Sequence, residues 1–367
     1  MRIGILAPVA WRTPPRHYGP WERVAGLLAE GLVAAGEEVT LFATADSVTS
    51  ATLDAVVPYG YAEDDELDGR VQEALHVGHA IARSGDFDLI HSHLDWLPLA
   101  LSRSWRAPVV TTIHGFSGPR ILPAYRAAQQ VPSAAHYVAI SDSDRSPELS
   151  YAATIHHGID LSELTASAHA GDALMTLGRI HPDKGTADAI EIARRNGRPL
   201  IIAGIIHDQR YFDEEVAPHL DGEHVRYLGS IGPEERSRLL GSAAVLLHPI
   251  HFDEPFGLSV VEAMACGTPV IAYRRGSMRE IIDQGVTGYV VDDLDAANAV
   301  VEPAARLDRI RIRGTAERRF AVDRMVRDYL EVYRRAVSRV PAGPAFRDRT
   351  GAGLSSGAER THRAPER

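Results

Sequence analysis

Two glutamates, Glu254 and Glu262, are spaced so that they could hold two ends of one polar ligand. Pro255 and Gly257 follow the first, and an amphipathic run leads to the second. Because an α-helix rises about 1.5 Å per residue, eight helical positions would span about 12 Å, which is comparable to a nucleotide-sugar measured from ribose to hexose. A surface helix with two solvated carboxylates would also explain the pair when it is taken alone.

Two basic residues, Arg179 and Lys184, offer a site for an anionic ligand in the same half of the chain. The planar fork of an arginine and the point charge of a lysine together suit a diphosphate. Gly178 and Gly185 flank them and favour phosphate binding over the alternative of two ordinary surface cations. Since the net charge is −10, an anion would have to be held by such local cations and not by the overall field.

Backbone N–H groups near the first glutamate could also face the anion. Phe256, Gly257 and Leu258 precede the predicted helix that carries Glu262, and the first N–H groups of a helix have no partner within it. Two carboxylates that touched a diphosphate would repel it. The pair therefore makes sense only if Glu254 reaches sugar hydroxyls and Glu262 reaches ribose hydroxyls.

Alternating strands and helices position these residues. The length of 367 residues favours two domains, because a single hydrophobic core seldom serves so long a chain. Near-continuous apolar runs predict buried parallel strands, which alternate with amphipathic helices in two successive doubly wound α/β units. The predicted strands cover residues 2–9, 39–43, 87–91, 109–113, 137–140, 173–177, 200–206, 225–228, 244–248, 270–273 and 288–291, and the main helices cover residues 21–35, 71–84, 186–196, 233–242 and 324–337.

Polar side chains follow three of the predicted strands in the first half. His93, His114 and Ser141 stand where strands end, and functional side chains of open parallel sheets gather at such carboxyl ends. We therefore expect them to face one crevice. His91 and His93 would point to one side of an extended segment, a spacing that also occurs in metal sites. A hydrogen-bonded pair is the favoured interpretation, since no carboxylate-rich complement is evident, and no metal site is predicted.

Composition and charge exclude several classes of protein. The net charge of −10 argues against broad nucleic-acid binding. No apolar run approaches the roughly 20 residues that span a bilayer, and the chain begins with a strand-like segment and no secretory signal. The single cysteine, Cys266, cannot form an internal disulfide and is most simply a small packed residue. We expect a cytoplasmic protein with no integral membrane segment and no nucleic-acid partner.

Several motifs resemble those of glycosyltransferase family 4. In the second half these are LGRIHPDKG, EPFGLSVVEAMACGTPVIA with its paired glutamates, GSMREII and GVTGYVV. In the first half the order of YGPWERVAGLLAEGLVAAGEEVTLFAT, DLIHSH, VVTTIHG, YVAISDS and HHGID also resembles that family. The resemblance covers residues 1–337, and the block around the two glutamates is its most specific part.

The resemblance implies the GT-B fold, in which two doubly wound Rossmann-like domains face a central cleft. Residues 1–165 would form the acceptor-side domain and residues 166–323 the nucleotide-sugar domain. Residues 324–340 would form a helix that crosses back onto the first domain, and residues 341–367, which are poor in apolar residues, are expected to be disordered.

The resemblance also implies the reaction. Members of the family are retaining enzymes that need no bound metal, and they move a hexose from a nucleotide-diphosphate sugar to an acceptor hydroxyl. The co-substrate would be a UDP- or GDP-sugar, with no other cofactor. The departing phosphate would help to deprotonate the acceptor on the same face, so no dedicated nucleophile is expected. The acceptor stays open between a sugar, a lipid head group and a natural product.

Roles for single residues follow from the resemblance. Arg179 and Lys184 would neutralise the leaving diphosphate, and Glu262 would bind ribose hydroxyls. Glu254 would hold the donor sugar and its phosphates together with backbone groups, and His114 would lie beside the donor sugar and the acceptor. Those backbone groups would come from Phe256, Gly257 and Leu258, and the loop that contains Gly19 would lie against the diphosphate.

Two positions depart from the family pattern. Pro20 stands where many members have a second glycine, and proline offers no N–H to a phosphate. His157 stands where many members have asparagine. Both departures bear on the details of the first domain and leave the fold prediction unchanged.

Three other functions remain as alternatives. A GT-B-fold nucleotide-sugar epimerase would share the phosphate-binding cations but turn over donor without acceptor. A catalytically inactive nucleotide-sugar-binding protein would bind donor without turnover. A metal hydrolase could instead be built on His91, His93 and His114.

Overall fold

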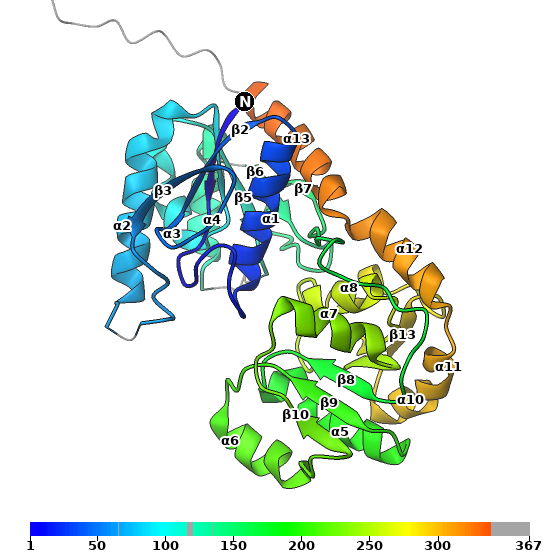
Figure 1. Cartoon of the computed structure of the whole chain (residues 1–367). Coiled ribbons are helices and arrows are strands. Elements are labelled where there is room, and N and C mark those ends of the chain that lie inside the picture. The colour runs from blue at the N-terminus through cyan, green and yellow to red at the C-terminus, as the bar shows by residue number, and fades with distance from the viewer. Residues whose placement is uncertain (65, 116–119, 135, 339–367) are drawn as a thin grey trace, which may run out of the picture.

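The computed structural model describes residues 1–64, 66–115, 120–134 and 136–338, and these form two α/β domains (Figure 1). Each domain is built on one sheet in which every paired strand is parallel to its neighbours. The disordered segment predicted for residues 341–367 lies outside the described residues. Within the described residues, no helix is both long and apolar enough to cross a membrane.

The first sheet has seven strands in the order β3-β2-β1-β4-β5-β6-β7. Its strands are β1 (Arg2–Leu6), β2 (Glu38–Thr44), β3 (Thr52–Val57), β4 (Leu89–Ser92), β5 (Val109–Ile113), β6 (His136–Ala139) and β7 (Tyr151–Thr154), and its helices are α1 (Pro20–Ala34), α2 (Gly69–Arg83), α3 (Trp96–Ala100) and α4 (Leu122–Gln129).

The second sheet has six strands in the order β10-β9-β8-β11-β12-β13. Its strands are β8 (Leu174–Leu177), β9 (Leu200–Ala203), β10 (Val225–Tyr227), β11 (Val245–His248), β12 (Val270–Tyr273) and β13 (Gly288–Val291). Its helices are α5 (Thr186–Arg195), α6 (Gln209–Tyr211), α7 (Pro233–Ser242), α8 (Leu258–Ala265), α9 (Met278–Ile281), α10 (Leu294–Ala299), α11 (Val301–Ala305) and α12 (Arg309–Phe320).

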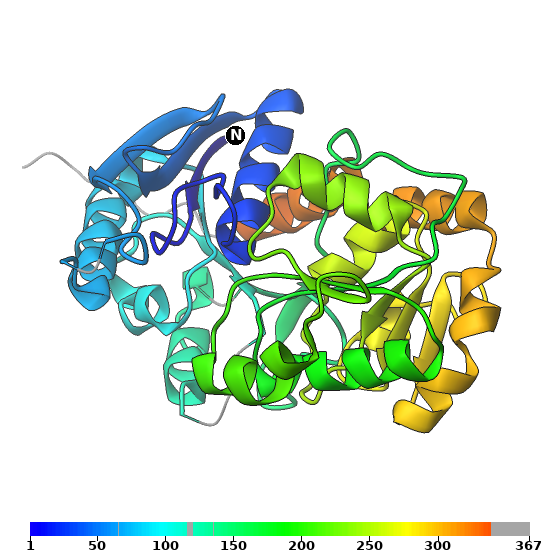
Figure 2. The same cartoon turned by 60° about the horizontal axis from the view of Figure 1, so that its bottom comes forward.

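The final helix, α13 (Val322–Ser338), returns to the first domain as the resemblance predicts. It follows α12, which packs on α8 of the second domain, and then runs alongside α1 (Figure 1 and Figure 2). Its apolar face joins the core of the first domain, where Met325, Tyr329 and Tyr333 are fully buried with Val24 and Leu28. Burial of this face holds the C-terminal end of the described chain on the N-terminal domain.

Two edge strands were not predicted from the sequence. β3 and β7 form opposite edges of the first sheet, and most of their residues are only partly buried or exposed. Central strands such as β11 are buried along their whole length and so read as apolar runs, whereas edge strands do not. The division predicted near residue 165 falls in the connection between β7 and β8, where no strand is found.

Strand order places the loops that carry the candidate residues. In each sheet, successive strands are added first on one side of the initial strand and then on the other. This reversal of strand order lies between β1 and β4 in the first sheet and between β8 and β11 in the second. Ligands of open α/β sheets bind outside the carboxyl ends of strands at such switch points. The loops after these four strands contain Gly19, His93, Arg179 and Glu254.

Candidate active site

A cleft of about 800 Å³ lies between the two domains and is lined by loops from both. Its walls include all nine candidate residues of the sequence analysis. They are Gly19, His114, Arg179, Lys184, Glu254, Phe256, Gly257, Leu258 and Glu262. Residues from the two halves of the chain therefore converge on one cleft.

Lys184 forms an ion pair with Glu254, with 2.7 Å between Nζ and Oε2. Lys184 ends a short 3-10 turn (Pro182–Lys184) after β8, and its ammonium also lies 4.5 Å from the centre of the Phe252 ring. Lys184 is the only lysine in the chain. The two residues are 70 positions apart in the sequence, and the adjacent strands β8 and β11 bring them together.

Glu254 is ionised at neutral pH. Burial alone would raise its pKa, but the imidazole of His248 and the charge of Lys184 outweigh burial and lower the pKa to about 2. The Nε2 atom of His248 lies 3.5 Å from the same carboxylate oxygen that Lys184 contacts. A largely buried, ionised carboxylate is thus held between two nitrogen-bearing side chains.

Arg179 lies on the same wall as Lys184. Its Nη1 donates to Nδ1 of His207 at 3.1 Å, and its Nη2 lies 3.6 Å from Asp183. Tyr18 of the first domain lines the same cleft, and the charge of Arg179 opposes the rise in the pKa of Tyr18 that burial causes. Two cations from the loop after β8 therefore face the cleft together.

The amino end of α8 opens onto the cleft next to these cations. Gly257 precedes the helix with a left-handed φ of 90°, and an added Cβ there would lie 2.8 Å from the Cε of Met278. Ser277 fixes the preceding turn, since its N–H donates to the carbonyl of Glu254 at 2.9 Å and its hydroxyl donates to that of Phe256 at 2.8 Å. Glu254 thus lies in this turn and Glu262 on the helix.

Glu262 is buried between two arginines. Its Oε1 atom lies 3.8 Å from Nη2 of Arg23 on α1 and 3.6 Å from Nη2 of Arg236 on α7. The Nε and Nη2 atoms of Arg236 are buried and have no hydrogen-bond partner among the described residues. Sequence reasoning missed both arginines, because no local sequence signal directs them at Glu262 and only the fold does so.

His114 directly follows β5, and its ring stacks on Trp21 with the ring centres 5.1 Å apart. Its Nε2 is hydrogen-bonded to Nδ1 of His93 at 3.0 Å, and its own Nδ1 is buried with no partner in the described part of the chain. Burial, with smaller effects from neighbouring histidines, lowers the pKa of His114 well below its usual range. The imidazole is therefore neutral at physiological pH.

Gly115, the residue after His114, lies where the two domains are in contact. An added Cβ at Gly115 would lie 2.2 Å from Cγ of Pro255, which follows Glu254 on the opposite wall. His157, one of the two departures from the family pattern, lies in the same region: its ring stacks on His114 at 5.1 Å and meets the edge of Phe256 at 4.9 Å. This imidazole therefore bridges the two walls.

Gly19 and Pro20 form the entrance to α1. Gly19 has a φ of 146° and immediately precedes the helix, and Pro20 is the first helical residue. Both residues line the cleft. The second departure from the family pattern therefore places a residue without an N–H at the amino end of α1.

The remaining strand-end residues do not form a metal site. His91 and His93 lie on one side of β4, with ring centres 4.3 Å apart, as their spacing predicts. Both nitrogens of His91 are engaged, one by Tyr333 of α13 at 2.6 Å and the other by Thr112 at 2.7 Å. Across the described ranges, no group of three or more His, Cys, Asp or Glu side chains could hold a metal ion. The arrangement gives the metal-hydrolase alternative no support.

His93 does not line the cleft, so the expectation that it faces the crevice is wrong. The same expectation is wrong for Ser141, which does not line the cleft either. It instead orders the loop after β6, where its hydroxyl accepts a hydrogen bond from the N–H of Asp144 at 3.1 Å and lies 3.0 Å from the hydroxyl of Ser143. A buried strand-end serine can serve its own loop, and residue type alone does not distinguish the two roles.

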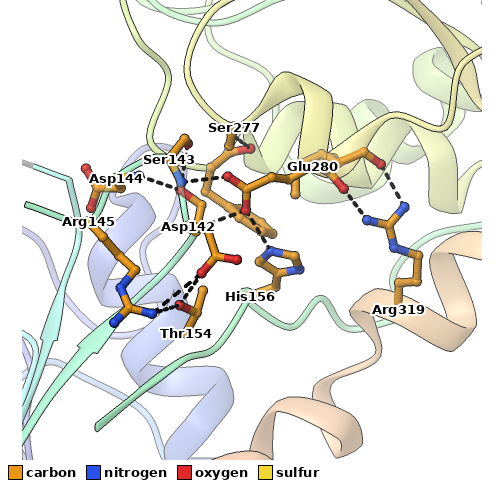
Figure 3. Close-up of polar contacts among 12 residues, drawn as sticks. Asp142, Ser143, Asp144, Arg145, Thr154, His156, Ser277, Glu280 and Arg319 are labelled. Carbon is orange, nitrogen blue, oxygen red and sulfur yellow. Dashed lines mark hydrogen bonds and ion pairs between the residues drawn. The ribbon is translucent and has the colours of Figure 1, made fainter. Parts of the chain in front are cut away.

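That loop is held by Glu280 of the second domain (Figure 3). Both carboxylate oxygens accept backbone N–H groups, from Asp142 at 2.8 Å and from Ser143 at 2.6 Å. His156 lies 3.5 Å from one of these oxygens, and Arg319 donates to the backbone carbonyl of Glu280. Glu280 belongs to the GSMREII motif, but nothing in the sequence indicates its partners. It fixes the two domains to each other beside the cleft.

Comparison with known proteins assigns the two halves of the chain. Residues 21–163 match the model of Glycosyltransferase Family 4, and residues 166–307 match that of Glycosyl transferases group 1. A D-inositol 3-phosphate glycosyltransferase from Arthrobacter sp. (strain FB24) is 30% identical, over 86% of this chain and 91% of the relative. A glycogen synthase of Mycobacterium tuberculosis (strain ATCC 25618 / H37Rv) is 27% identical, over 82% of this chain and 85% of the relative.

Solved structures share the fold at lower sequence identity. Sucrose-phosphate synthase from Thermosynechococcus elongatus superposes with a TM-score of 0.73 at 20% identity, covering 92% of this chain and 99% of that one. AviGT4, a glycosyltransferase involved in avilamycin A biosynthesis, gives 0.70 at 22% identity, covering 92% and 98%. Anabaena Alr3699/HepE in complex with UDP and glucose gives 0.69 at 19% identity, covering 91% and 100%.

Proposed function

This chain belongs to glycosyltransferase family 4, and on that premise we propose that it moves a hexose from a UDP- or GDP-sugar to an acceptor hydroxyl with retention of anomeric configuration. The observation that carries the proposal is the meeting of Lys184, Arg179 and the amino end of α8 in one cleft. Two cations and a helix amino end together make a strong site for a diphosphate.

The two glutamates orient the donor along this wall. Glu262 lies between Arg23 and Arg236, so its charge is compensated and its oxygens can accept ribose hydroxyls. The Nε and Nη2 atoms of Arg236, which make no hydrogen bond among the described residues, would then lie beside the nucleotide. Glu254 would accept hydroxyls of the hexose, which is attached to the other end of the diphosphate.

Lys184 changes partner when the donor binds. A diphosphate between Lys184 and the amino end of α8 would compete with Glu254 for the ammonium, which lies 2.7 Å from that carboxylate. The carboxylate of Glu254, with His248 still 3.5 Å away, would then be free to accept sugar hydroxyls. Binding of the two ends of the donor is thereby coupled.

The reaction needs no metal in this proposal. The bond between the anomeric carbon and the diphosphate oxygen breaks, while Arg179 and Lys184 stabilise the negative charge that develops on the diphosphate. The acceptor oxygen bonds to the anomeric carbon on the same face, and its proton passes to the departing phosphate oxygen. Neutral His114, with an unpartnered Nδ1, would lie beside the reacting hydroxyls.

The relatives support the reaction class and leave the substrates open. Their names include an inositol phosphate glycosyltransferase and a glycogen synthase, so the acceptor varies widely among them. One structural neighbour was solved with UDP and glucose, which makes UDP-glucose the first donor to test. The cytoplasm is the proposed compartment, since the only cysteine, Cys266, is free and buried.

Product analysis by mass spectrometry tests the proposal. The protein is incubated with UDP- and GDP-hexoses, first alone and then with a pool of sugar, lipid and natural-product acceptors. A hexosylated acceptor supports the proposal, and its loss in Lys184→Ala and Glu254→Ala variants supports the site. Conversion of the donor to an epimer without acceptor would instead identify an epimerase, and nucleotide binding without any product would identify an inactive binding protein.

A further inference from the structure

The wall that the first domain contributes to the cleft is aromatic and acidic. Three of the four tryptophans in the chain line the cleft, and all three come from this domain. The aromatic residues there are Trp11, Tyr18, Trp21, Tyr61 and Trp96, and the carboxylates are Glu22, Glu73 and Asp95.

The carboxylates Glu73 and Asp95 both line the cleft, and neither is paired with a cation among the described residues. Tyr61 donates to Glu73 at 2.9 Å and Tyr125 donates to Asp95 at 2.5 Å. Burial raises the pKa of both groups, and the charge of Asp95 adds to the rise at Glu73. Neither carboxylate forms an ion pair with any residue that the structure describes.

The arginines and the lysine that line the cleft serve its opposite wall. Among the described residues, Arg179, Lys184 and Arg236 belong to the second domain, and Arg23 of α1 points at Glu262. A further arginine of the first domain, Arg16, lies 3.6 Å from each of Asp46 and Glu63 and does not line the cleft. An anion bound against Glu73 and Asp95 would therefore meet like charges with no compensating cation.

Trp96 offers a flat apolar surface beside these carboxylates. It begins α3 directly after Asp95, and 46% of its surface is exposed although it lines the cleft. Across the same wall, Trp11 meets Tyr18 edge-on at 6.1 Å. Exposed aromatic faces next to hydrogen-bond acceptors suit the apolar face and the polar rim of a sugar-like ring.

We propose that this acceptor wall, formed by Trp11, Tyr61, Glu73, Asp95 and Trp96, binds a polyhydroxylated ring that carries no phosphate or carboxylate. The ring would stack on Trp96 and donate hydroxyl or ammonium hydrogens to Glu73 and Asp95. His114, whose buried Nδ1 has no hydrogen-bond partner among the described residues, lines the same cleft and would lie beside the reacting hydroxyl. The inference rests on the proposed function, because it assigns the acceptor of that reaction.

Binding of three matched sugars tests whether the acceptor wall excludes a ring that carries a negative charge. The protein is first saturated with UDP or GDP, whichever binds by calorimetry, so that phosphate cannot enter the donor site. Saturation-transfer NMR then measures the affinities of methyl glucoside, methyl glucosaminide and glucose 6-phosphate. We expect either or both of the first two to bind at least tenfold more tightly than glucose 6-phosphate. Stronger glucosaminide binding would identify an ammonium as the donor, and equal binding would identify hydroxyls.

Variants connect that preference to the acceptor wall. Glu73→Gln and Asp95→Asn should each weaken binding of the preferred sugar about tenfold without changing the affinity for UDP or GDP, which also reports correct folding. Glu73→Lys should strengthen binding of glucose 6-phosphate. The matched control is Glu38→Gln, since Glu38 is an exposed carboxylate at the amino end of β2, away from the cleft.

The outcomes that contradict the acceptor assignment differ from the outcome that contradicts the proposed function. If glucose 6-phosphate binds as tightly as the other sugars, if none of the three binds, or if both conservative variants bind like the wild type, the acceptor assignment is wrong. If neither UDP nor GDP binds in the first titration, the proposed function itself fails.

Discussion

Replacing Lys184 with alanine would leave the carboxylate of Glu254 buried without its ammonium partner. The fall in the pKa of Glu254 from 4.5 to about 2 corresponds to about 3 kcal/mol of preferential stabilisation of the ionised form. His248 contributes part of this stabilisation, so we expect Lys184→Ala to lower the free energy of unfolding by about 2 kcal/mol. The melting temperature at pH 7 should fall by several degrees.

A second substitution separates stability from catalysis. In the variant Lys184→Ala/Glu254→Gln the unpaired charge is gone, so at least half of the lost stability should return. Transfer should remain at least about 10²–10³-fold slower than in the wild type, because the cation that stabilises the leaving diphosphate and the carboxylate that would accept hexose hydroxyls are both missing. Lys184→Arg is the matched control, since it keeps the charge and with it most of the stability.

The pH dependence of stability tests the same interaction between Lys184 and Glu254. The pKa of Glu254 is depressed, so its contribution to stability is present above about pH 4.5 and is lost as the pH falls toward 2. Thermal unfolding of wild type and Lys184→Ala between pH 7 and pH 3 measures this loss, and the difference between the two proteins should shrink as the pH falls. A constant difference, or full transfer activity in Lys184→Ala, would refute the reasoning.

Three further predictions concern the packing between and within the domains. Gly115→Ala should separate the loops on the two walls, since the new Cβ would lie 2.2 Å from Cγ of Pro255, and X-ray scattering should show a larger radius of gyration than for wild type. Glu280→Gln should weaken the contact with the loop after β6 and lower kcat/KM at least fivefold, with unchanged secondary structure by circular dichroism. Burial raises the pKa of Glu22 to about 7, so between about pH 4.5 and pH 7 the folded protein binds more protons at this residue than the unfolded chain does. The free energy of unfolding should therefore fall as the pH rises through this range. Glu22→Gln should reduce this pH dependence of the melting temperature.

The fold was predictable wherever apolar periodicity is strong. The central strands and the long helices α1, α5, α7 and α13 lie within a few residues of their predicted bounds, because a strand buried on both faces must be apolar throughout. The edge strands β3 and β7 lack that constraint and were missed. The beginning of α8 at Leu258, four residues after Glu254, also agrees with the predicted order of turn and helix.

The site was predictable by residue type and not by pairing. The sequence identified Arg179, Lys184, Glu254 and Glu262, but no local signal says that Lys184 contacts Glu254 across 70 residues. The approach of Arg23 and Arg236 to Glu262 depends on how three helices pack. Long-range contacts of charged side chains carry no periodicity in the sequence, and only the fold reveals them.

The most direct test of the donor site uses the fact that Lys184 is the only lysine in the chain. Reductive methylation with ¹³C-formaldehyde keeps the charge of the lysine and yields one labelled side chain, together with the terminal amine. On titration with UDP or GDP, the NMR signal of Lys184 should move and saturate at the affinity that calorimetry measures, because the ammonium leaves Glu254 for the diphosphate. If calorimetry shows binding while that signal stays in place, the donor is not held by Lys184, and the proposed site is contradicted.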